Sequence, residues 1–216
     1  MDFTYLFQPY EHLVTKTDQS FQSIEKEHST CIKCKRHCSD CCHAVFGLFL
    51  IEAVFLKHDF DKLEHEVKKA ALLRSDKADK SLEELEKKVK VFQNDPQMTA
   101  YSLARERIRC PLLDDNHNCV LYPFRPITCR AYGIPTVIQG KARVCNKAAF
   151  LKGKSYPAFD LDGIYRELYS LSKELLNRAG QDNNQRASLL ISVSKIIKTP
   201  VEELIYDGPV KSDRSD

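Results

Sequence analysis

The chain has 216 residues, of which 43% are hydrophobic and 29% charged, and its formal net charge is +3. Such a chain can bury the core of one globular domain, so metal is not needed merely for folding. Lysines alternate with glutamates, and no segment has the one-signed charge that indicates nucleic-acid binding, so we expect no nucleic-acid partner.

From the sequence we expect neither a secretory signal nor a membrane span. Its first twenty residues contain early acids and lack the basic and apolar regions of a signal peptide. The longest apolar run, residues 44–56, is interrupted by Glu52 and is shorter than the about 20 residues a span needs. We therefore expect a cytoplasmic protein with no membrane partner. In a reducing compartment, clustered cysteines indicate metal binding or catalysis rather than disulfides.

Apolar periodicity predicts helices over most of the chain. The expected helices lie, in chain order, at about residues 3–28, 44–56, 61–95, 96–108, 162–180, 185–198 and from 200 onward. Residues 61–95 form one exposed helix or two, because the middle of this stretch is polar on all sides. Asp162 is the predicted N-cap of its helix, and Gly180 is the predicted stop. The last eight residues, 209–216, are expected to fray.

Two cysteine-rich segments lack this periodicity. Residues 31–42 contain five cysteines, and residues 110–145 contain four cysteines among several prolines and glycines. Turns and irregular structure are the natural expectation for both. We therefore predict an all-α fold for a single domain spanning 1–216. This domain is expected to have a helical arm at 61–95. It is also expected to contain an irregular insert, organised by a metal that the ligand loops 31–42 and 110–145 hold.

The first cysteine segment carries the strongest chemical signal. Thiolates are soft ligands that suit zinc and iron–sulfur clusters much better than magnesium or calcium. Cys34, Cys38 and Cys41 have a spacing that also occurs where three cysteines hold a four-iron cluster. Cys42 follows Cys41 directly, so their side chains diverge, which suggests that Cys42 serves another metal atom or a second centre. The alternative is that the cysteines are small buried hydrophobic residues.

Charged and aromatic neighbours of the cysteines allow two interpretations each. Basic residues near the clusters could lower the pKa of the thiols or only cap surface turns; they are Lys33, Lys35, Arg36, Arg109, Arg125, Arg130 and Arg143. His37 and His43 flank the cysteines and could be ligands, although enough thiols are present without them. Glu52 is expected at the solvent edge of its helix, with a buried acid near the site as the alternative.

The motif CxxxCxxCC at residues 34–42, followed by RCPLLDDNHNCVLYPFRPITCRAYGIPT at 109–136 and by Cys145, resembles the YkgJ-type cysteine-cluster family of zinc- or iron-chelating domains. The resemblance implies eight metal ligands: Cys34, Cys38, Cys41, Cys42, Cys110, Cys119, Cys129 and Cys145. Cys31 lies outside the pattern and is the candidate spare cysteine. A similar array occurs in flagellin lysine methylases, but this chain has no glycine-rich nucleotide-binding turn.

Three functions remain open from the sequence. The first is a metal-binding protein whose zinc or iron–sulfur centre, of the 4Fe-4S type, is structural, redox-active or handled as cargo. Closed all-thiolate sites of this kind argue against hydrolysis. The second is an iron–sulfur-dependent protein-modifying enzyme similar to the lysine methylases, for which the sequence identifies no catalytic residue. The third is a zinc-stabilised interaction protein that presents the 61–95 helix to a protein partner.

Overall fold

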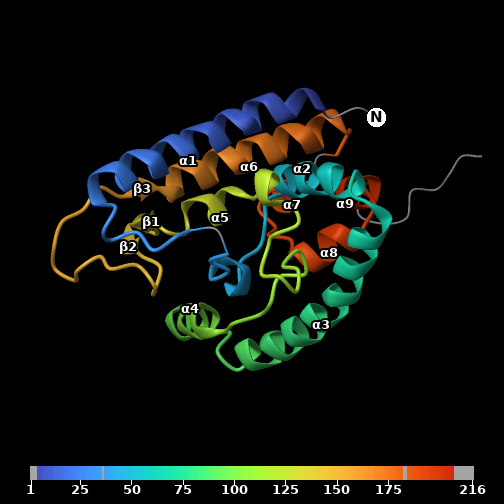
Figure 1. The fold of residues 1–216 in the computed structure, drawn as a ribbon. Coiled ribbons are helices and arrows are strands. Elements are labelled where there is room, and N and C mark those ends of the chain that lie inside the picture. Colours follow the sequence, from blue (N-terminus) through green and yellow to red (C-terminus); the bar gives the residue numbers. More distant parts are fainter. Residues whose placement is uncertain (1–3, 36, 182–183, 207–216) are drawn as a thin grey trace, which may run out of the picture.

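The computed structural model describes residues 4–35, 37–181 and 184–206. Two long helices, α1 (Phe7–His28) and α6 (Leu161–Arg178), lie side by side and antiparallel along one face (Figure 1). Helix α2 (Leu50–Asp61) packs on both, and α3 (His65–Lys90) runs down one side of the molecule. The other helices are α4 (Pro96–Arg105), α5 (Ile127–Ala131), α7 (Asn184–Ala187), α8 (Val193–Lys198) and α9 (Val201–Tyr206). Short 3-10 turns lie at Thr4–Leu6, Cys41–His43 and Tyr122–Phe124.

The core lies where α2 crosses α1 and α6. Helix α2 is apolar on nearly all sides because it is enclosed by α6, α8 and α9. Helix α6 turns Leu168, Ser172 and Leu175 into the core, where all three are fully buried. The Ser172 hydroxyl donates to the Leu168 carbonyl (2.8 Å) and accepts from the backbone N–H of Ile51 (3.2 Å). The single polar group on this face therefore joins α6 to the first turn of α2.

The polar stretch within 61–95 is part of one continuous helix. Helix α3 buries Ala71, Ser75, Ala78 and Leu85, which are three, four or seven residues apart and so share one side of the helix. This side packs against α8, where the Lys198 ammonium lies 2.6 Å from Asp76 and 2.7 Å from Asp79. The helix is therefore attached to the domain along one face, and its remaining faces are exposed.

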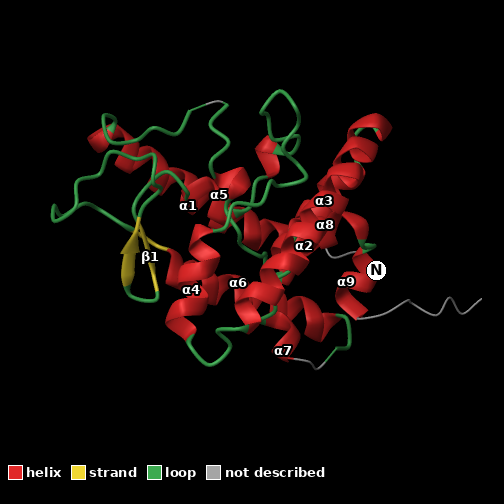
Figure 2. Cartoon of the chain, turned by 90° about the horizontal axis from the view of Figure 1, so that it is seen from below, coloured by secondary structure: helices red, strands yellow, loops and turns green. Residues whose placement is uncertain are grey.

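The fold is mostly helical but not all-α. A small sheet with strand order β2-β1-β3 is built from β1 (Thr136–Ile138), β2 (Lys141–Arg143) and β3 (Phe159–Asp160). It lies at the end of the molecule opposite α3 (Figure 2). Strands β1 and β2 are antiparallel, with Thr136 opposite Arg143, and β1 and β3 are parallel. The prediction missed these strands because they are two or three residues long, too short to show alternation.

The hairpin turn also changes the role predicted for Asp162. Gln139 and Gly140 both have positive φ (52° and 68°), as a two-residue hairpin turn requires. The Asp162 carboxylate accepts from both of their N–H groups, at 2.8 and 3.1 Å. The N-cap of α6 is instead Asp160, whose carboxylate accepts from the N–H of Gly163 (2.9 Å). The helix stop at Gly180 is confirmed by its φ of +69°.

Two helix boundaries differ from the predictions. Residues 44–49 are extended rather than helical, because Leu48 and Ile191 pair through two 2.9 Å backbone hydrogen bonds. The partner segment interrupts the helix predicted over 185–198, which is split into α7 and α8. A Cβ on Gly47 would lie 2.6 Å from that of Leu190, so the two segments meet at contact distance. Residues 209–216 lie outside the described part, and no described helix is long and apolar enough to cross a membrane.

Candidate metal centre

Backbone pairing brings the two cysteine-rich segments together. The N–H of Cys110 donates to the carbonyl of Cys42 (2.7 Å), and the N–H of Ile108 donates to that of His43 (3.0 Å). Ala44 and Arg107 form an antiparallel bridge beside them. These contacts join cysteines that are almost 70 positions apart in the sequence, which no local pattern could have shown.

A tight loop then returns the chain from Cys110 to Cys119. Leu113 and Cys119 form an antiparallel bridge, and the N–H of Val120 donates to the carbonyl of Leu112 (2.9 Å). At the tip, the Asp114 carboxylate accepts from the N–H of Asn118 (2.7 Å). The apolar residues of this loop are buried while its polar tip is exposed, so the loop itself is a small folded unit.

Helix α5 places Cys129, and a buried carboxylate positions α5. Glu52 is only 2% exposed, which overturns the expectation of a solvent-edge position. Its carboxylate accepts from the N–H groups of Ile127 (3.1 Å) and Phe49 (3.3 Å), at the starts of α5 and α2. Burial raises the pKa of Glu52 to about 7, and the two hydrogen bonds oppose that rise. Arg130, the neighbour of Cys129, pairs with Asp18 on α1 (2.7 Å) and so anchors α5 from the other side.

Six of the eight predicted ligands line two adjoining hollows. The inner cavity, of about 70 Å³, is bounded by Cys41, Cys42, Cys110, Cys119 and Cys129 together with apolar side chains that include Leu56, Ala78 and Leu82. The outer cleft, of about 400 Å³, is lined by His37, Cys38, Cys41, Cys42, Leu113, His117, Asn118, Cys119, Tyr122 and Arg125. Cys41, Cys42 and Cys119 line both hollows and so form the wall between them.

Cys41 is the electrostatic centre of this group. Hydrogen bonds from the thiols of Cys129 and Cys42 lower the pKa of Cys41, and Arg125 lowers it further. The same hydrogen bonds raise the pKa of Cys42 and of Cys129, which act as the donors. Burial raises the pKa of Cys110 to about 12. Without metal the cluster therefore favours one thiolate, at Cys41, surrounded by thiols that keep their protons.

The two remaining ligands adjoin this group from the side of the sheet. Burial raises the pKa of Cys34 to about 12, and Cys38, Cys41 and Cys145 add to the rise. The Cys34 sulfur faces Gly133, where an added Cβ would lie only 2.5 Å from it. Cys34 therefore lies close enough to Cys38, Cys41 and Cys145 for their charges to act on it, while Cys34 and Cys145 themselves line neither hollow.

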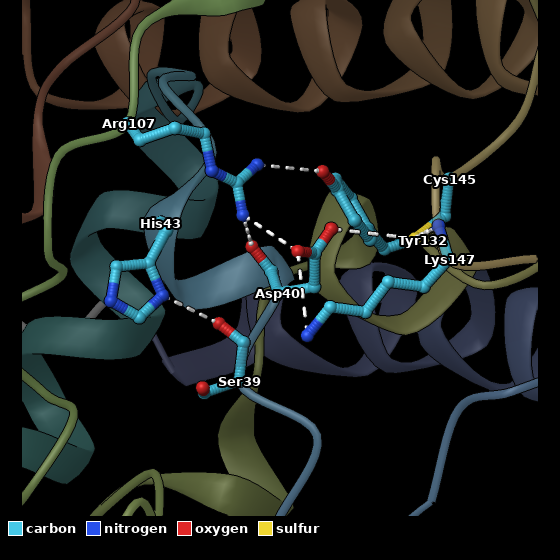
Figure 3. Close-up of polar contacts among 7 residues, drawn as sticks. All are labelled: Ser39, Asp40, His43, Arg107, Tyr132, Cys145 and Lys147. Atoms are coloured by element: carbon cyan, nitrogen blue, oxygen red, sulfur yellow. Dashed lines mark hydrogen bonds and ion pairs between the residues drawn. The ribbon is translucent and has the colours of Figure 1, made fainter.

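Asp40, which the sequence analysis did not single out, links the ligand segments by polar contacts (Figure 3). Its carboxylate contacts the Arg107 guanidinium (2.8 Å) and accepts from the thiol of Cys145 (3.4 Å). The Lys147 ammonium lies 3.8 Å away. The Arg107 side chain also donates to the backbone carbonyl of Asp40 (2.8 Å) and to the Tyr132 hydroxyl (3.4 Å). A polar residue between two ligand cysteines was the sequence feature that could have identified it.

The other candidates from the sequence take structural roles. Cys31 lines neither hollow, and its carbonyl accepts from the N–H of Ala149 (2.8 Å). The His43 ring is turned away, with Nδ1 2.9 Å from the Ser39 carbonyl (Figure 3). Arg109 and Arg130 donate to turn carbonyls, so the capping interpretation holds for them, while Arg125 also lowers the pKa of three thiols. Arg36 lies outside the described residues.

The cysteine sulfurs suit a soft metal, although they are not arranged around a single ion position. All nine cysteines are free, and the ligand set is almost entirely sulfur. In the described ranges, no three His, Cys, Asp or Glu side chains are arranged to hold an ion. Two sulfurs on one tetrahedral zinc are about 3.8 Å apart. A bound zinc ion would therefore have to draw the sulfurs around Cys41 to this separation.

A helical domain whose loops bring free thiols together around two adjoining hollows indicates the class of cysteine-rich metal-chelating proteins. The chain belongs to the CxxCxxCC family, described as "Putative zinc- or iron-chelating domain", whose model matches residues 33–146. The matched range contains the eight predicted ligands and excludes Cys31. No curated protein and no solved structure matches the chain.

Proposed function

We propose that this protein binds an iron–sulfur cluster or zinc through Cys34, Cys38, Cys41, Cys42, Cys110, Cys119, Cys129 and Cys145, and that it serves in electron transfer or metal handling. The observation that carries the proposal is that eight free thiols come together from both loops and from α5, six of them around two adjoining hollows. Packing alone does not require so many thiols in one part of the molecule.

The surroundings of the sulfurs support this function. A cluster of four thiolates and a divalent centre carries net negative charge, and Arg125 lies next to Cys41 and Cys119 to offset it. The apolar side chains that line the inner cavity lower the local dielectric constant, which raises the cost of leaving such charge unpaired and strengthens metal–thiolate bonds. When bound, a four-iron cluster would supply one-electron chemistry, and zinc would supply rigidity or serve as cargo.

The crowding of sulfurs favours iron over zinc. A structural zinc site needs only four ligands. Here Cys41 contacts Cys42 and Cys129 directly and also affects the pKa of Cys34, Cys110 and Cys119. One sulfur with so many sulfur neighbours suits a polynuclear centre, whose metal atoms share a small volume.

The test is anaerobic purification of the full chain with elemental analysis and a visible spectrum on one sample. We expect iron and sulfide at about four per chain and a broad visible absorption. Colourless protein with up to about two zinc ions per chain would replace the iron assignment by zinc. Cys41→Ser should abolish metal binding, whereas the matched Cys31→Ser should retain the wild-type content. Absence of any metal in wild-type protein purified without oxygen would refute the proposal.

A further inference from the structure

The outer cleft has the size and position of a ligand site next to the cysteine cluster. Its volume of about 400 Å³ lies in the range that small-molecule sites occupy. Sulfurs of Cys38, Cys41 and Cys119 form one part of its wall, while the exposed His37, His117 and Tyr122 stand at its rim. Metal binding by the cysteines does not by itself require a cleft of this kind.

Two residues of the cleft have unfavourable backbone conformations. In the described ranges, the residues other than glycine with positive φ are His37 (69°), His117 (60°) and Gln139 (52°). Gln139 is accounted for by the hairpin turn and its hydrogen bond to Asp162. His37 and His117 come from different loops yet line the same cleft, and each left-handed residue costs about 1 to 2 kcal/mol. Strain of this kind collects at ligand-binding sites.

The cleft offers hydrogen-bond donors that have no internal partner. Within the part of the chain that the structure describes, neither imidazole forms a hydrogen bond. Arg125 lies over the Tyr122 ring (3.7 Å) and donates through Nε to the Tyr122 carbonyl (3.0 Å), which fixes its direction. Its Nη atoms form no hydrogen bond or ion pair with a described residue. Three side chains therefore present N–H groups to the cleft.

No carboxylate among the described residues balances this side of the cleft. The lining contains no Asp or Glu. The nearby Asp114 accepts from the N–H of Asn118, and the Asp115 carboxylate pairs with Arg109 (2.8 Å). Apart from the Cys41 thiolate, the cleft offers a guanidinium, two imidazoles and an amide as hydrogen-bond donors and has no carboxylate in its lining, an arrangement that can bind an anion.

We propose that the outer cleft binds a small anionic chelator, bearing carboxylate or thiolate groups, that exchanges metal with the cysteine cluster; the proposal rests on the proposed function. The anion would lie against Arg125 and the two histidines, and its metal would face Cys38 and Cys41. Each bond from the ion to the chelator is replaced by a bond to a cysteine sulfur, and the displaced thiol proton passes to solvent. The oxidation state of the metal is unchanged, so no oxidant or reductant is needed.

The first experiment measures binding of citrate and, separately, glutathione to the reduced, metal-free full chain by titration calorimetry. Two arms are used because one chelator has only carboxylates and the other adds a thiol. His37→Asn combined with His117→Asn removes both imidazoles, and Asn tolerates positive φ. Arg125→Gln removes the guanidinium, and Arg166→Gln is the matched control on α6, whose side chain is 74% exposed. Thermal melts establish that each variant is folded.

We expect at least one chelator to bind the wild type and the Arg166→Gln control equally. Binding should weaken about tenfold or more in the histidine double variant and in Arg125→Gln, because each loses charge-assisted hydrogen bonds. The proposal is overturned if neither chelator binds, or if both cleft variants bind as the wild type does. Zinc sulfate added without chelator separates the two claims. Wild type that takes up no zinc and that also contains no iron after purification without oxygen refutes the proposed function, whereas wild type that takes up metal but binds no chelator refutes only the cleft assignment.

Discussion

Glu52→Gln gives a test of the buried carboxylate that holds α5, and with it Cys129, in place. The wild-type carboxylate is fully enclosed and accepts from the N–H groups of Phe49 and Ile127. Gln has nearly the same shape and keeps one carbonyl acceptor, but it cannot ionise. Comparison of the two proteins across pH therefore isolates the cost of ionising this side chain.

The sign and the size of the change in folding stability with pH follow from the pKa of Glu52, which burial raises from 4.5 to about 7. At low pH the acid is protonated in both the folded and the unfolded state, so ionisation costs nothing. As the pH rises through the unfolded pKa, only the unfolded chain releases the proton, and folding stability is lost until the pH passes the folded pKa. Between about pH 5 and pH 8, the free energy of unfolding of wild type should fall by about 2 to 3 kcal/mol relative to Glu52→Gln.

The assay is urea denaturation of both metal-free, reduced proteins at the two pH values, followed by circular dichroism. Any constant difference between a carboxylate and an amide as acceptor cancels when the pH values are compared, and so do the other titrating groups. A difference between the two proteins that is the same at both pH values would refute the assignment of a buried acid with a raised pKa.

Three further predictions concern the metal centre. Gly133→Ala should weaken metal binding at least about tenfold in a chelator competition. The added Cβ would lie only 2.5 Å from the Cys34 sulfur and would therefore displace it. Unchanged affinity would show that Cys34 is free to move. Asp40→Asn removes a negative charge that raises the pKa of Cys145, so peptide mass spectrometry should find faster alkylation of that thiol in metal-free protein, and a slower rate would contradict the contact. Metal-free protein should also lose stability in urea as the pH rises from about 9 towards 12, because Cys34 and Cys110 have pKa values raised to about 12 and keep protons that the unfolded chain releases; stability that is constant there would refute the raised values.

The sequence predicted best what depends on long, regular patterns. Periodicity identified α1, α3 and α6. The family pattern delimited the cysteine-rich region, because thiols at fixed spacing are rare without a chemical reason. These features are local, so a single sequence is enough to show them.

Contacts between distant segments account for what the sequence did not predict. The run at 44–56 is apolar throughout, but its first part is extended because Leu48 pairs with Ile191, and apolar composition cannot distinguish the two conformations. An acid in an apolar run is usually exposed, so the sequence predicts a solvent-edge position for Glu52. Glu52 is buried because its carboxylate accepts hydrogen bonds from backbone N–H groups at the starts of α2 and of the distant α5. Asp40 gains its role from Arg107 and Cys145, which are far from it in sequence.

The most direct test of the central claim is X-ray absorption spectroscopy at the metal edge of protein purified without oxygen. We expect the metal to have only sulfur neighbours, at a metal–sulfur distance of about 2.3 Å, whether the metal is zinc or iron. The spectrum of Cys31→Ser should be the same as that of wild type. A first shell dominated by nitrogen or oxygen would contradict the assignment of these cysteines as the metal ligands.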